Sequence, residues 1–263
     1  MNKPAIVNWL KIGKGLAAAL VAFAAAEASA IEGTVATETD SFSGDVKWHA
    51  RDKKYVIQKG KVTKEFKLAE VTSLDIAKPQ GFDKAVQMVE GGQGASAIAT
   101  LTKIVADYRM LQWDKPAGRY LALAYLGSGN AQKAYDACTP IIAEDRAAAY
   151  SGDLAAAYWQ ALMKLGKTEH LEKLLKDAAT KGNRQSSAAA LVMRGDIIVA
   201  GSNDAPEEIK RALRDGYMRV VLMYQDAECA RERGEAMLKA AQCFDKLGQS
   251  ARAETLRVQA KGM

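Results

Sequence analysis

Three glycines recur at a fixed interval in the middle of the chain. Gly92, Gly129 and Gly166 lie 37 residues apart (92 to 129, then 129 to 166), and each one separates two apolar segments of helical periodicity. A fixed period of about 20–50 residues is typical of repeat proteins, in which every repeat is one small supersecondary unit. The spacing therefore predicts an array of helical hairpins with a glycine at each turn.

Residues at matched distances from these glycines are small or apolar. Seven and four residues before each glycine, the matched sets are Ala85, Ala122 and Trp159, and Met88, Tyr125 and Leu162. Five, nine and twelve residues after each glycine, they are Ala97, Ala134 and Leu171; Leu101, Cys138 and Leu175; and Ile104, Ile141 and Ala178. A further copy near the C-terminus contains Ala241, Phe244, Gly248 and Ala253. The pattern resembles the tetratricopeptide repeat (TPR) over roughly residues 82–260, which implies about five stacked hairpins in a mostly α-helical solenoid.

Polar residues after the glycines indicate where the second helices begin. We expect each glycine to end a helix in the left-handed conformation and a nearby side chain to cap the next helix, in the pairs Gly129 with Asn130, Gly166 with Thr168 and Gly248 with Ser250. The fourth unit is longer than the others. It is predicted to contain a helix over 186–200, a cap at Asn203 or Asp204, and a long helix from Pro206 to about Tyr224.

The TPR resemblance implies a concave groove lined by the first helix of each hairpin. Carried over to this sequence, the groove positions are Arg119, Leu123, Ala156, Gln160, Lys164, Asp196, Gln242 and Lys246. The family's clamp for acidic peptide tails uses a basic residue and asparagines. Only Arg119 fits it, and Leu123 replaces an asparagine, so acidic tails are not the expected ligand. The alternative is that these side chains form an ordinary solvated surface.

Residues 31–78 are predicted to form a small β domain ahead of the helical repeat domain, 79–263. Phe42, Val46 and Trp48 alternate with polar residues, as in a half-buried strand. Further strands are expected over 32–39, 55–57, 62–68 and 73–76, so that five strands form a small barrel or a rolled sheet. The segment FKLAEVTSLDI resembles the end of SH3-like and Sm-like barrels. A unit this small has a thin core and is expected to pack against the helical repeat domain.

The β segment is basic. The candidate polyanion-binding residues are Lys47, Arg51, Lys53, Lys54, Lys59 and Lys61. They are compatible with binding to an anionic envelope glycan or lipid headgroup. Equally, lysines on strand exteriors prevent edge-to-edge aggregation.

The first 30 residues have the features of a secretory signal peptide. Lysines precede an apolar run from Leu16 to Ala26, and Ala28-Ser29-Ala30 matches a cleavage site. We expect cleavage after Ala30 and export, most simply to a bacterial periplasm, with no transmembrane span in the mature chain. The alternative is an uncleaved anchor, although 11 apolar residues fall short of the roughly 20 that span a bilayer.

The residues give no pattern for catalysis, a metal or a cofactor. His49 and His170 lie in different predicted domains, and the three cysteines lack metal-ligand spacing. Cys138, Cys229 and Cys243 are expected to be buried thiols, with a Cys229–Cys243 disulfide as the alternative. The sequence therefore predicts a non-catalytic scaffold that binds a protein or peptide in the cell envelope and does not bind nucleic acid. The alternative function is a glycan-binding or polyanion-binding accessory that acts through the basic β segment.

Overall fold

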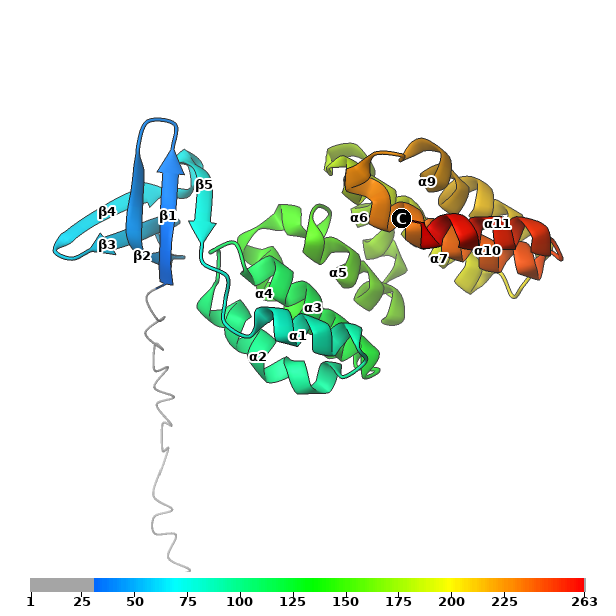
Figure 1. Cartoon of the computed structure of the whole chain (residues 1–263), viewed down its shortest axis with the longest axis horizontal. Coiled ribbons are helices and arrows are strands. Elements are labelled where there is room, and N and C mark those ends of the chain that lie inside the picture. Colours follow the sequence, from blue (N-terminus) through cyan, green and yellow to red (C-terminus); the bar gives the residue numbers. More distant parts are fainter. Residues whose placement is uncertain (1–30, 263) are drawn as a thin grey trace, which may run out of the picture.

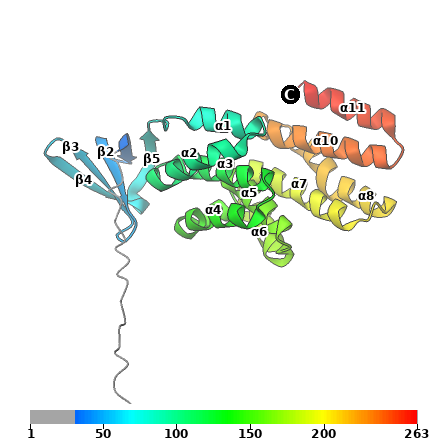
Figure 2. The ribbon, with the colours of Figure 1, turned by 90° about the horizontal axis from the view of Figure 1, so that it is seen from below.

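The computed structural model describes residues 31–262. A small sheet lies at one end of the molecule, and helices extend from it toward the C-terminus (Figure 1). A view turned by 90° shows the last two helices at the end opposite the sheet (Figure 2). The chain is mostly α-helical with a short N-terminal β segment, as the sequence predicts.

The sheet has five antiparallel strands. They are β1 (Ile31–Thr37), β2 (Ser41–His49), β3 (Lys54–Lys59), β4 (Val62–Lys67) and β5 (Val71–Ile76). The alternation predicted for β2 is correct, since Val46 is buried and its neighbours Asp45 and Lys47 are exposed. One turn of 3₁₀ helix, η1 (Leu68–Glu70), precedes β5, which begins two residues before the predicted 73–76 strand.

Five helical hairpins follow within the described residues. They are α1 (Phe82–Glu90) with α2 (Gly94–Asp107); α3 (Asp114–Gly127) with α4 (Ala131–Glu144); α5 (Asp153–Lys164) with α6 (Thr168–Lys181); α7 (Arg184–Gly201) with α8 (Pro206–Ala212) and its continuation; and α10 (Ala230–Lys246) with α11 (Ser250–Lys261). Two short 3₁₀ turns, η2 (Arg146–Ala149) and η4 (Ala227–Cys229), connect neighbouring hairpins. The predicted TPR-like array of about five units is therefore present.

The glycine turns are built alike. Gly92, Gly129, Gly166 and Gly248 all have positive φ, between 68° and 77°. After each glycine, the next backbone N–H bonds the carbonyl five residues earlier: Gln93 to Met88 at 2.7 Å, Asn130 to Tyr125 at 2.8 Å, Lys167 to Leu162 at 3.0 Å and Gln249 to Phe244 at 2.8 Å. This is the Schellman arrangement that ends helices at a left-handed residue, so the repeated glycine has one local structural cause.

The predicted caps are correct at one turn only. The Asn130 side chain accepts a hydrogen bond from the Lys133 N–H at 3.0 Å. The predictions for Thr168 and Ser250 are wrong, because those residues are the first of their helices and the preceding Lys167 and Gln249 make no side-chain cap bond. The glycine turn already fixes where the second helix begins, which makes the side-chain cap dispensable.

The fourth unit departs from the others in its turn and in its second helix. Asn203 and Asp204 adopt positive φ in place of a glycine, and neither caps α8, whose N-cap is Ala205. The predicted long helix is present but contains a π segment, η3 (Leu213–Tyr217), before α9 (Met218–Met223). The backbones of η3 and α7 approach each other closely at this segment, since a Cβ on Gly216 would lie 2.8 Å from the Gly195 Cα.

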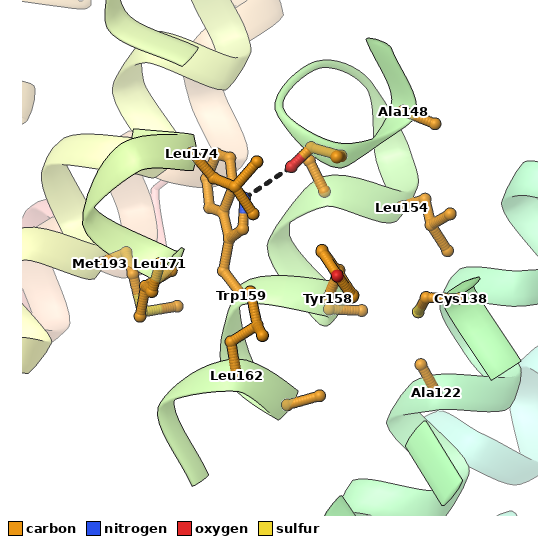
Figure 3. Packing of buried hydrophobic residues seen from close by; sticks show 14 of the residues in the cluster. Ala122, Cys138, Ala148, Leu154, Tyr158, Trp159, Leu162, Leu171, Leu174 and Met193 are labelled. Atoms are coloured by element: carbon orange, nitrogen blue, oxygen red, sulfur yellow. Dashed lines mark hydrogen bonds between the residues drawn. The ribbon is translucent and has the colours of Figure 1, made fainter. Parts of the chain in front are cut away.

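The matched repeat positions form the core. Ala97, Ala134 and Leu171 are fully buried, and most of the other matched residues are buried with them. Figure 3 shows the central cluster, where Trp159 lies among Leu162, Leu174 and Met193. The indole Nε1 of Trp159 donates to the Ala149 carbonyl at 2.8 Å, so the buried ring satisfies its polar atom.

The sheet takes part of its core from the helical segment. Leu111, in the loop between α2 and α3, is 3% exposed and belongs to the hydrophobic cluster of the sheet. In the same loop the Met110 carbonyl accepts a hydrogen bond from the Tyr55 hydroxyl at 3.0 Å. Met110 and Gln112 adopt left-handed backbone conformations, with φ of 59° and 71°. The sheet therefore packs against the helical repeat domain, as a thin core predicts.

The closed-barrel alternative for the sheet is wrong. The strand order β4-β3-β2-β1-β5 leaves β4 and β5 at opposite edges. At the end of β5, the Gln112 Oε1 accepts the Ile76 N–H at 3.3 Å, and the Trp113 Nε1 donates to the Ile76 carbonyl at 2.9 Å. Side chains of the α2–α3 loop thus bond the backbone groups of Ile76, which a closed barrel would need for pairing β5 with β4.

Candidate binding groove

Residues predicted for the concave groove converge on one small cavity. Arg119 and Leu123 of α3, Gln160 of α5 and Asp196 of α7 line a cavity of about 100 Å³. Ala156, one helical turn before Gln160, lines it as well. Because these residues come from the first helices of three successive hairpins, the cavity is the floor of the groove. The predicted residues Lys164, Gln242 and Lys246 are not among those that line it.

The remaining wall comes from the start of α10, which the sequence interpretation missed. Arg231, Glu232 and Glu235 line the cavity opposite α3 and α5. The charged residues at 231, 232 and 235 of the sequence were the available signal, because spacings of three and four place side chains on one face of a helix. The sequence interpretation instead assigned the groove positions of α10 to Gln242 and Lys246, further along the same helix.

A partly buried polar network holds one side of the groove. The Asp196 carboxylate accepts from the Tyr217 hydroxyl at 2.8 Å and from the Lys239 Nζ at 2.5 Å, and Lys239 also pairs with Glu235 at 2.9 Å. Burial disfavours the charge on Lys239, but the two carboxylates outweigh burial and raise the pKa of Lys239. Burial, followed by the nearby Asp196, raises the pKa of Tyr217. This network fixes α7, η3 and α10 relative to one another.

Glu232 carries a carboxylate oxygen without a partner. The side chain is 3% exposed, and its Oε1 accepts from the Arg231 Nε at 2.8 Å and from the Gln185 Nε2 at 3.5 Å. Its Oε2 is buried and has no hydrogen-bond partner among the described residues. A buried acceptor without a donor costs about 1–3 kcal/mol. The Glu232 carboxylate, whose side chain belongs to the lining of the cavity, is therefore incompletely hydrogen-bonded.

Arg119 supplies a cation on the facing wall. Its guanidinium lies 4.9 Å from the centre of the Tyr120 ring. Among the described residues it forms no salt bridge, in contrast to Lys239 and Arg231 in the same groove. The lining of the cavity thus combines donors from Arg119 and Gln160 with the carboxylate of Glu232, a set suited to hydrogen bonding with a peptide group or a polar side chain.

The structure separates the predicted polyanion-binding residues. Arg51 and Lys53 lie at the turn between β2 and β3, whereas Lys59 and Lys61 flank the turn at the other end of β3. A six-residue strand places these turns roughly 17–20 Å apart. Lys47 projects from the middle of β2, and Lys54 is paired with Glu65 at 2.9 Å. The six side chains therefore do not form one continuous patch, and binding to a glycan stays a prediction.

The cysteines and the acidic residues near Cys229 do not indicate a metal centre. Cys138, Cys229 and Cys243 are all free and buried, in agreement with the buried-thiol interpretation and not with a Cys229–Cys243 disulfide. Burial raises the pKa of Cys138 to about 12. Asp226, Glu228 and Cys229 come within metal-binding distance of one another, but the Asp226 carboxylate already pairs with Arg184.

Among known proteins, this chain resembles two solved structures in its fold. No protein-family model matches the sequence, and no curated protein matches it. Two crystal structures of a Podosopora anserina putative kinesin light chain with nearly identical TPR-like repeats, one of them a variant with a single substitution, resemble the fold at 18% identity. They cover 69% of this chain and 91–92% of their own, with TM-scores of 0.42 and 0.41. The assignment of TPR-like hairpins here rests on the turns and the packing described above.

Proposed function

We propose that this chain is an exported, non-catalytic scaffold that binds a protein or peptide partner in its concave groove. The observation that carries the proposal is the convergence of Arg119, Gln160 and Glu232 on the lining of one cavity. Hydrogen-bonding groups without internal partners gain most from a ligand, because binding removes the cost of leaving them unpaired. At about 100 Å³ the cavity holds a single side chain or peptide group rather than a cofactor.

Export is the second part of the proposal. The segment expected to act as a signal peptide lies outside the described residues. The first strand of the sheet begins at Ile31, which cleavage after Ala30 would make the first residue of the mature chain. In the part of the chain that the structure describes, no helix has the length and apolar character needed to cross a membrane. The intact mass of the mature protein, purified from an envelope fraction, should correspond to a chain that starts at Ile31.

Site-specific photocrosslinking tests the groove. A photoreactive amino acid at Gln160 should capture a partner in cells that express the full chain, whereas the same amino acid at exposed Lys173 on α6 should not. Arg119→Glu should weaken capture at least tenfold, which corresponds to about 1.4 kcal/mol of binding free energy. Arg219→Glu, the same charge change on the exposed face of α9, is the control and should leave capture unchanged. Equal capture at positions 160 and 173 would rule out the groove as the binding site.

A further inference from the structure

We draw no further inference here: the strongest candidate, the cleft of about 640 Å³ between α6, α7 and α8, combines apolar side chains with both acidic and basic ones, and nothing in the structure shows what covers it.

Discussion

At the scale of single residues, the recurring glycines act through their backbone. A Cβ added at Gly92, Gly129, Gly166 or Gly248 would meet no atom within 4 Å, so these positions do not require glycine for space. They require it for conformation, because the left-handed region raises the conformational free energy of a residue with a side chain by about 1–2 kcal/mol. By contrast, Gly195 and Gly216 are required for close approach, since a Cβ on Gly195 would lie 2.5 Å from the Tyr217 ring.

A matched pair of alanine substitutions checks this distinction. Gly129→Ala should lower the free energy of unfolding by about 1–2 kcal/mol, since φ is 76° and the space is open. Gly127→Ala, two residues earlier in α3 and equally open, should raise it by up to about 1 kcal/mol, because it restricts the unfolded chain without strain. Urea denaturation of both variants gives the comparison. Equal effects at the two positions would contradict a conformational role for Gly129.

At the scale of elements, the loop between α2 and α3 connects the two parts of the molecule. It buries Leu111 in the sheet, bonds Tyr55 through the Met110 carbonyl, and holds the end of β5 through Gln112 and Trp113. The left-handed backbones of Met110 and Gln112 cost about 1–3 kcal/mol each, and these contacts offset that cost. The loop is therefore a structural part of the sheet, although it lies more than 30 residues beyond β5.

Truncation of Leu111 tests the role of this loop. Leu111→Ala should destabilise the sheet by about 2–5 kcal/mol, the usual range for a buried leucine. Hydrogen exchange at Val35, Val46 and Ile57 should accelerate, while exchange in α5 and α6 changes little. Leu238→Ala is the control, because that side chain is 48% exposed. If exchange in the sheet is the same in both variants, the loop does not support the sheet.

At the scale of the whole molecule, the sheet shares its hydrophobic cluster with the loop between the first two hairpins. The boundary predicted at residue 78 divides the chain between β5 and α1, but the core of the sheet extends past it to Leu111 and Trp113. The first groove residues, Arg119 and Leu123, lie on α3, the helix that follows this loop directly. The position of the sheet therefore depends on the same helix that begins the concave groove.

Two fragments test this dependence. Residues 31–78 alone should be unfolded, because the sheet loses Leu111 and has a thin core. Residues 31–144, which add α1 to α4 and the connecting loop, should fold and give dispersed amide signals in an NMR spectrum. The free energy of unfolding of 31–144 should fall when Leu111→Ala is introduced. A folded 31–78 fragment would show that the sheet is independent of the helices.

The sequence alone determined the features that depend on neighbouring residues. The left-handed glycines, the hairpins around them and the alternation of Val46 with its neighbours all follow from contacts within a few positions along the chain. The concave positions Arg119, Leu123, Gln160 and Asp196 followed from the repeat, because the same face of each first helix turns inward.

Only the tertiary structure decided the features that depend on residues far apart in the sequence. The start of α10 completes the groove and Leu111 fills the core of the sheet, because packing brings together residues that lie 35 to more than 100 positions apart. The strand order likewise decides that β4 and β5 form the two edges of the sheet. Periodicity identifies the buried face of an element but not its partner. For the same reason, the Glu232 oxygen without a donor is visible only once the surrounding helices are in place.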